Sequence, residues 1–161
     1  ASMEMNGLEL ELMYQVTEAW DLMVTYGYLE AEYKDYLADL TGDGVITDNS
    51  GLIPRNTPEN TFGITTSYTT QVGDGELKGR ISYRFRDEMN SDSSNNPYGD
   101  LDSIENVNAT INYSIDNYSI TIWGRNLTDE REQRWATIGG LTSRGWWNEP
   151  QTLGITFSAS Y

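Results

Sequence analysis

The sequence contains no cysteine and no histidine, and these absences remove several classes of active site. Without cysteine the chain has no disulfide and no thiol nucleophile, and without both residues it lacks the side chains of common zinc sites. Histidine-based acid–base catalysis is excluded in the same way. Acidic residues are plentiful, but no pair has a partner or an environment suited to acid–base work. We therefore assign no catalytic residue and expect no enzyme.

Long apolar runs and basic residues are also missing. No run approaches the roughly 18 apolar residues of a transmembrane helix, which excludes a helical membrane protein. The chain starts without a basic region followed by an apolar stretch, so we expect a mature fragment or a truncated reading frame if the protein is exported. With 10 basic against 25 acidic residues, the net charge of -15 argues against binding nucleic acid.

The pattern that dominates the 161 residues is an alternation of apolar and polar side chains with a period of two. This period is typical of strands with one apolar and one polar face. Each stretch is close to the ~10 residues that cross an outer membrane as a β-strand. We expect about seven meandering antiparallel strands, centred on Leu8–Tyr14, Trp20–Tyr28, Phe62–Tyr68, Leu77–Phe85, Val107–Tyr113, Tyr118–Ile122 and Leu153–Tyr161.

The connections between these strands alternate strictly in length. Short turns are expected at residues 17–19, 73–75 and 116–117, and long polar loops at residues 34–56, 87–103 and 128–150. All long loops then lie at one end of the sheet, as in outer-membrane barrels with short periplasmic turns and long extracellular loops. Aromatic residues near the ends of the apolar faces fit the girdles of such barrels. The fold class predicted is an all-β, antiparallel transmembrane β-barrel fragment, an open curved sheet if alone.

Four short motifs resemble the TonB-dependent outer-membrane receptors. Residues 124–129 (GRNLTD) are similar to the element before the last extracellular loop of these receptors, and residues 150–161 (PQTLGITFSASY) to their final strand. Residues 6–11 (NGLELE) and 57–62 (TPENTF) resemble two earlier strands. The motifs come in the family's order and cover nearly the whole chain. The last residue, Tyr161, departs from the family's usual Phe but stays aromatic.

The resemblance implies a function as well as a fold. The family imports scarce ligands such as siderophores, cobalamin or glycans through a plugged barrel of about 22 strands, using energy passed on by TonB. Residues 1–161 would then be the C-terminal portion of the barrel, in contact with outer-membrane lipid, with the plug, the earlier strands and the TonB contact outside this sequence. Alternatives are an outer-membrane barrel or translocator without a plug, and a soluble calcium-dependent sugar-binding β-domain.

A possible calcium loop lies in the first long connection. Asp39, Thr41 and Asp43 stand at positions one, three and five of an EF-hand-like spacing, Val45 could offer its carbonyl, and Thr47 stands at position nine. Position twelve is a Ser rather than a bidentate carboxylate, and no helices flank the loop. Calcium is thus the one possible cofactor, and an acidic glycine-rich loop without an ion is the alternative.

A basic stripe on the fourth strand is the second candidate site. Lys78, Arg80, Arg84 and Arg86 occupy the polar face, which would line the barrel lumen. A basic wall attracts anionic ligands. Alternatively these cations pair with acidic groups of the plug or of neighbouring strands.

The last loop and the last strand provide two further candidates. Trp135, Trp146 and Trp147 in the loop could stack on a ligand, or could instead sit in a girdle or pack the loop. In the last strand, Gly154, Phe157 and Tyr161 have the spacing of the signal that the barrel-assembly machinery reads in this family. The physical requirement for that signal is an edge strand that can pair with the machinery.

Overall fold

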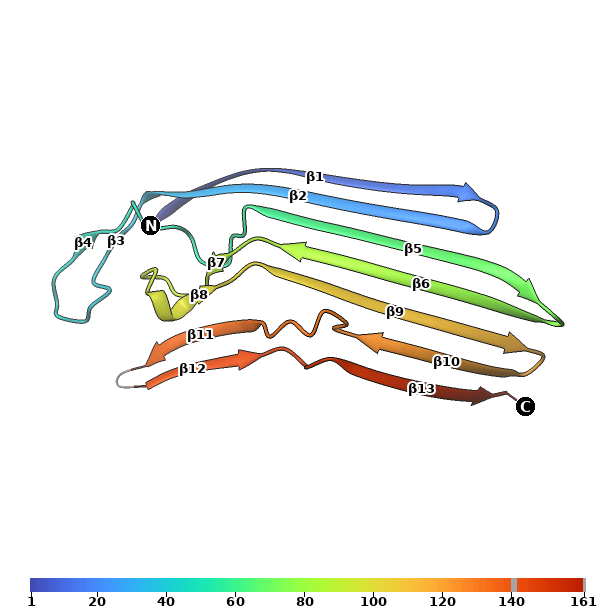
Figure 1. Ribbon diagram of the computed structural model, residues 1–161. Coiled ribbons are helices and arrows are strands. Elements are labelled where there is room, and N and C mark those ends of the chain that lie inside the picture. Colours follow the sequence, from blue (N-terminus) through green and yellow to red (C-terminus); the bar gives the residue numbers. More distant parts are fainter. Residues whose placement is uncertain (140–141, 161) are drawn as a thin grey trace.

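A computed structural model describes residues 1–139 and 142–160, and the burial of all of these except 137–139, 142 and 143. Seven strands form one antiparallel sheet in the order of the chain, without crossovers (Figure 1). The strands of this sheet are β1 (Ser2–Thr17), β2 (Trp20–Asp35), β5 (Asn60–Val72), β6 (Gly75–Arg86), β9 (Ile104–Ile115), β10 (Tyr118–Arg125) and β13 (Thr152–Ala159). The predicted seven-stranded meander is confirmed.

Each strand of the sheet alternates in side-chain direction, and the register aligns the alternation across the whole sheet. Leu10 pairs with Tyr26, Tyr26 with Phe62, and Phe62 with Phe85, so these residues share one face. We call this side the apolar face. The opposite side, the polar face, carries the aligned row of Glu11, Thr25, Gly63, Arg84 and Asn106. Hydrogen-bonded partners in an antiparallel pair always point to the same side, which is why the two faces stay separate.

The predicted alternation of connection lengths is also found. Tight turns join β1 to β2, β5 to β6 and β9 to β10, whereas long loops follow β2, β6 and β10 at the other end of the sheet. Figure 1 shows these loops gathered at the end where the chain begins, with the C-terminus at the turn end. No helix among the described residues is long and apolar enough to cross a membrane.

The long loops contain secondary structure that the sequence pattern does not predict. Each carries one small antiparallel pair of strands. These pairs are β3 (Leu37–Ala38) with β4 (Thr47–Asp48), β7 (Met89–Asn90) with β8 (Asp100–Leu101), and β11 (Gln133–Gly139) with β12 (Thr142–Trp147). A short 3-10 helix, η1 (Pro97–Gly99), begins after Asn96, whose side chain accepts a hydrogen bond from the Tyr98 N–H.

Apart from the glycines Gly75 and Gly124, the buried residues lie in the loops rather than in the sheet. Among residues of described burial, the core hydrophobic residues are Leu101 and Ala136, at 2% and 1% exposure, and Leu101 is the one with a large side chain. Large side chains of the apolar face are open, as Leu12 at 57% and Ile155 at 70% illustrate. A soluble domain buries its large apolar residues in a core. This sheet instead presents a broad apolar surface on one side and a polar surface on the other.

Candidate ligand-facing surface

The basic stripe of β6 lies on the polar face of the sheet, and its position in a barrel lumen stays a prediction. On the same face, at the edge of the sheet, β1 carries Glu9 and Glu11. Between the two strands the polar face is hollowed into an open cavity of about 840 Å³, whose lining includes Glu11, Gly63, Arg80 and Arg84. The hollow thus has an acidic side and a basic side, a charge distribution that can orient a polar or dipolar partner.

Arg86 differs from the other cations of the stripe. Its guanidinium donates to the backbone oxygen of Asp102 at 3.1 Å and pairs with a carboxylate oxygen of Glu132 at 3.3 Å. Both side chains of this ion pair are largely buried, at 15% and 11% exposure. Lys78, Arg80 and Arg84 make no hydrogen bond or ion pair with other described residues. Arg86 therefore anchors the last loop to β6. The open basic surface is formed by Lys78, Arg80 and Arg84.

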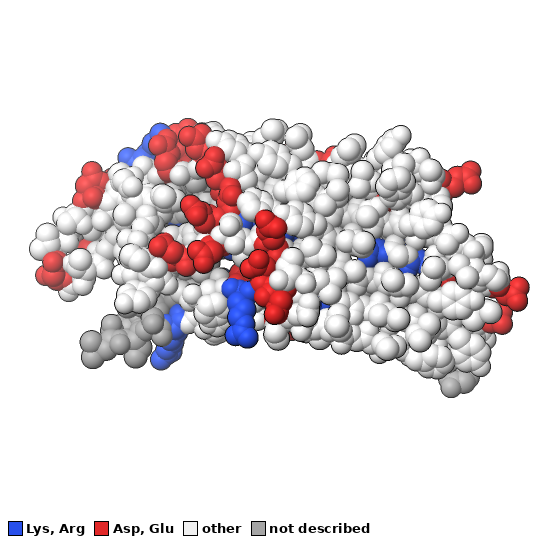
Figure 2. Space-filling model, in the orientation of Figure 1, with Lys and Arg blue, Asp and Glu red and all other residues white. Residues whose placement is uncertain are grey.

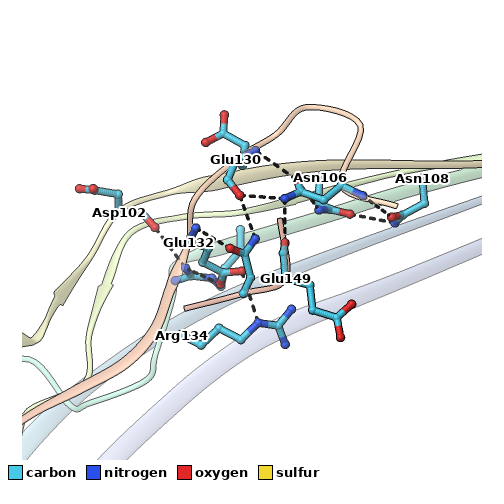
Figure 3. A network of polar contacts seen from close by, with 10 residues as sticks. Asp102, Asn106, Asn108, Glu130, Glu132, Arg134 and Glu149 are labelled. Carbon is cyan, nitrogen blue, oxygen red and sulfur yellow. Dashed lines mark hydrogen bonds and ion pairs between the residues drawn. The ribbon is translucent and has the colours of Figure 1, made fainter. Parts of the chain in front are cut away.

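The base of the last loop is organised by Asn126, which is 4% exposed and adopts a positive φ of 50°. Its side-chain amide donates to the backbone oxygens of Glu130 and Glu149, the two ends of the loop. Its side-chain oxygen accepts from Asn106 on β9. Figure 3 shows this network, with Glu130 and Glu149 approaching from the loop and Asn106 and Asn108 from the wall. Asn126 thus closes the loop and fixes it to the barrel wall.

The sequence motif at residues 124–129 marked this region as part of a family resemblance, but it did not reveal what Asn126 does. A buried Asn at a positive φ is a usual device for closing a tight turn, because its short amide bonds to nearby backbone and tolerates the left-handed region. The signal that could have found it is the Asn-Leu-Thr-Asp sequence directly after a strand.

The tryptophans of the last loop lie on the β11–β12 hairpin. Trp135 and Trp146 are cross-strand partners with ring centroids 5.8 Å apart and planes tilted by 52°. They are 38% and 73% exposed, and Trp147 is 62% exposed. Cross-strand aromatic pairs stabilise a hairpin, and exposed indole faces can stack on flat ligand groups. Trp135 and Trp146 thus form an exposed aromatic surface at the loop end, and Trp147 is exposed at the next position of β12, where side chains alternate in direction.

The Asp39 loop has a hydrogen-bonded structure of its own. One carboxylate oxygen of Asp39 accepts from the backbone N–H of Gly42 at 2.7 Å, and the other from that of Gly44 at 2.7 Å. The Gly44 bond is the largest cause that lowers the pKa of Asp39 below its ordinary value. Asp43 accepts from the Val45 N–H at 2.8 Å.

No group of three or more acidic side chains in the described residues is arranged to hold a metal ion. The two aspartates therefore account for the path of this loop through their own hydrogen bonds. Calcium binding, with Thr41 and Thr47 as further ligands, stays a prediction.

In the last strand, Gly154 and Phe157 have different surroundings. Phe157 is 68% exposed on the apolar face, where its ring stacks on Tyr118 at a centroid distance of 6.2 Å. Gly154 lies beneath the indole of Trp123, and a Cβ at this position would overlap that ring. Gly154 therefore has a packing reason to be glycine besides the predicted assembly signal. Tyr161 lies outside the described residues.

The surface of the loop end is strongly acidic. In Figure 2, Asp and Glu side chains gather over the end that carries the long loops and over the adjoining part of the sheet, with few Lys and Arg among them. A second open hollow of about 750 Å³ between the first two long loops has Glu59, Asp87, Glu88, Asp100 and Asp102 in its lining. The lining of this hollow also includes Phe85 of the apolar face, whereas the basic stripe lies on the polar face of β6.

Comparisons with known proteins agree with this geometry. A family model described as TonB dependent receptor-like, beta-barrel, matches residues 1–127. The ferric yersiniabactin uptake receptor FyuA from Yersinia pestis has a similar fold, with a TM-score of 0.82, 15% identity, and coverage of 99% of this chain and 24% of that one. The siderophore receptor PiuA from Acinetobacter baumannii gives a TM-score of 0.79 at 21% identity, with 99% and 22% covered. The chain spans about a quarter of their length.

Proposed function

Because this chain belongs to the family of TonB-dependent receptor β-barrels, we propose that it forms the C-terminal strands of a receptor in the bacterial outer membrane. It supplies part of the barrel wall and three of the outward loops. The full receptor imports a scarce ligand with energy that TonB delivers through a plug domain. Two structural neighbours are siderophore receptors, which makes a ferric siderophore the first ligand to test, before cobalamin or a glycan.

The observation that carries this proposal is the slanted upper limit of the apolar face. On β1 the outermost apolar residue of this face is Leu8, which lies level with Asn60 of β5 through Tyr28. On β13 it is Leu153, which lies level with Thr66 of β5 through the intervening strands. The limit therefore falls by six residues of β5 from one edge of the sheet to the other.

This slope gives the angle between the strands and the membrane. Six strand spacings of about 4.8 Å separate β1 from β13, and six residues of about 3.4 Å separate the two levels. A membrane surface along this line requires strands tilted by about 35° from the membrane normal, within the range of about 35–45° for outer-membrane barrels. From Leu77 to Phe85, the apolar face of β6 then spans about 22 Å along the normal, close to the ~25 Å apolar band of such barrels.

A change of polarity on the first hairpin supports the same boundary. Below Leu8 and Tyr28, apolar side chains point to the apolar face. Above this level the outward positions are polar, with Glu4 opposite Glu32, and the apolar residue Met5 points to the other face. Glu4 and Glu32 both contact Lys34, which suits a surface in water rather than in hydrocarbon. The hairpin therefore extends beyond the bilayer.

The two edge strands require partners. β1 and β13 each pair with only one neighbour in the seven-stranded sheet. Hydrocarbon cannot satisfy the remaining backbone N–H and C=O groups, so in the membrane both edges pair with further barrel strands of the full protein. During assembly the β13 edge, with Phe157 facing lipid and Tyr161 at its end, is the segment that the barrel-assembly machinery would recognise.

Single-cysteine labelling tests the membrane position, and the absence of native cysteine makes it simple. We expect cysteines at Ile81 and Tyr83 to react with a lipid-soluble maleimide and not with a membrane-impermeant one in outer-membrane fractions. A cysteine at Ser82, on the polar face of the same strand, should react with the membrane-impermeant maleimide once the protein is solubilised. Uniform labelling by the aqueous reagent, or recovery of the protein in the soluble fraction, would instead favour the soluble sugar-binding domain.

Uptake assays test the transport step. A strain that lacks the gene should lose uptake of one iron-loaded siderophore. A strain that keeps the gene but lacks TonB should lose the same uptake. Loss of cobalamin or glycan uptake instead would change the ligand and keep the mechanism. A reading frame without any plug domain before residue 1 would favour the translocator that has no plug.

A further inference from the structure

The middle loop, residues 87–103, contacts each neighbouring loop through a side chain that bonds to backbone, and a backbone bond from the Asn56 N–H to the Asn90 oxygen at 2.8 Å adds to the contact with the first loop. Toward the first loop, the Asn95 side-chain oxygen accepts the backbone N–H of Ile53 at 2.6 Å, and the Asn95 amide donates to the Ile53 oxygen at 2.8 Å. One amide side chain thus satisfies both backbone groups of one residue, as a neighbouring strand would. Asn95 adopts a positive φ of 49° to do so.

Toward the last loop, Ser91 makes the corresponding contact. Its hydroxyl oxygen accepts the backbone N–H of Ala136 at 3.2 Å and donates to the Ala136 oxygen at 2.9 Å. Ser91 is 4% exposed and Ala136 is 1% exposed, so water does not compete for these groups. The oxygen of Gly99, 3.1 Å from the hydroxyl, already accepts the Ser91 backbone N–H at 2.8 Å. The Ser91 hydroxyl therefore donates its one proton to the Ala136 oxygen, which is the nearer acceptor.

The position of Ala136 gives this contact its importance. Ala136 lies in β11 directly after Trp135, and it is bonded to Ser91 on the edge of β11 that faces away from β12. An isolated two-stranded hairpin is marginally stable in water. Leu101, which is 2% exposed, adds apolar burial in the middle loop. The Trp135–Trp146 pair therefore depends on the middle loop for a fixed position.

We propose that Ser91 is a positioning residue that holds the β11–β12 hairpin, and with it the Trp135–Trp146 pair, in one preformed surface with the middle loop. Asn95 joins the first loop to the same unit. The inference rests on the proposed function in one respect only, since the surface matters to a ligand if the loops face the outside of the cell. The three loops then meet a ligand as one body and not as three independent arms, which reduces the ordering cost of binding.

The test is Ser91→Val in the full-length protein in detergent, because valine cannot bond to Ala136 and has nearly the shape of threonine, which serves as its control. We expect amide hydrogen exchange at Ala136 to become about tenfold faster or more, as the loss of a buried hydrogen bond predicts. The exciton circular dichroism of the indole pair, identified by subtracting the spectrum of Trp146→Phe, should weaken. Ser91→Thr, which keeps the hydroxyl, should restore both signals.

The matched control is Ser94→Ala in the same loop. The Ser94 hydroxyl bonds to Asp92 two residues away and does not reach the last loop, so this variant should leave both signals at wild-type values. If Ser91→Val prevents folding, Ser91→Ala provides the smaller change. Wild-type exchange and an intact dichroism signal in the Ser91 variants would overturn the proposal, and so would an equal effect of Ser94→Ala. Absence of the protein from outer membranes would contradict the proposed function and leave these two signals readable.

Discussion

The seven-stranded sheet, which we call the wall, is held by hydrogen bonds between backbone groups, and its large side chains stay exposed. In the loops, by contrast, buried polar side chains bond to backbone groups. Leu12 in the wall is 57% exposed, and Ser91 in the loops is 4% exposed. In the proposed receptor, lipid would cover the apolar side chains of this sheet. The loops carry their own small core of Leu101, Ala136 and buried polar groups. Each region should respond to a different kind of substitution.

A charge on the apolar face should give the largest effect and test the wall. Ile81 lies in the middle of the apolar stretch of β6, near the membrane midplane, where Arg costs about 2–4 kcal/mol. We expect Ile81→Arg to lower the free energy of unfolding by that amount in urea titrations of the complete barrel in lipid vesicles. Ser82→Arg, one residue further along on the polar face, should have little effect. Equal losses at the two positions would contradict the assignment of faces.

Asn126→Ala should give the next largest effect and test the loops. The substitution leaves the backbone oxygen of Glu149 without its side-chain donor, takes one of two side-chain donors from the Glu130 oxygen, and removes an acceptor from Asn106. Each unsatisfied buried group costs about 1–3 kcal/mol. We expect residues 126–151 to become sensitive to protease in intact cells, while heat resistance of the barrel in detergent is kept. A matched loss of heat resistance would show that loop and wall are one cooperative unit.

Asn126→Asp divides this effect into its two parts. Asp keeps the acceptor oxygen and the tolerance for a positive φ, but it loses the amide donors to Glu130 and Glu149. We expect an intermediate protease sensitivity. Wild-type resistance of the Asp variant would show that the acceptor side of Asn126 carries the loop closure.

Gly154→Ala tests the wall from its polar face. The added Cβ would overlap the indole of Trp123, and overpacking of this kind costs about 1–3 kcal/mol. We expect reduced thermal stability of the barrel that the double variant with Trp123→Ala partly restores. Gly79→Ala is the matched control, because nothing lies within 4 Å of a Cβ there. No restoration in the double variant would mean that Gly154 serves the assembly signal rather than packing.

The wall was predictable from sequence, and the loops were not, for a physical reason. A strand with one face in lipid must alternate with period two, so residues such as Leu77–Phe85 reveal the strand and its two faces. The positions of Lys78, Arg80 and Arg84 on the polar face followed directly. The loop contacts join residues far apart in sequence, such as Ser91 with Ala136, and no periodicity encodes them.

Arg86 illustrates the limit of the pattern. The period-two alternation of β6 puts Arg86 on the polar face with the basic stripe. Its pairing with Glu132 depends instead on how the last loop folds back on the sheet. The β11–β12 hairpin was hidden for a similar reason. The sequence indicates its Trp residues as candidates for ligand contact, but the pairing of Trp135 with Trp146 is evident only from the register.

The smallest effect expected concerns the Asp39 loop, which is exposed and closed by charge-assisted hydrogen bonds rather than by burial. The bonds from Gly44, Gly42 and Thr41 hold the pKa of Asp39 below the ordinary value of an Asp carboxyl. A lowered pKa means that the ionised form contributes order that is complete above the ordinary Asp value of about 3.9 and is lost as the pH falls through the lowered one. We expect the Gly44 amide proton in NMR spectra of the detergent-solubilised protein to lose its hydrogen-bonded shift only in that acid range. Asp39→Asn should remove the titration at all pH values, while the buried contact of Ser91 with Ala136 should not titrate at all.

A Gly44 shift that is constant down to pH 2 would show that the loop is held by its backbone alone. A shift that changes on adding millimolar calcium at neutral pH would support calcium binding by this loop.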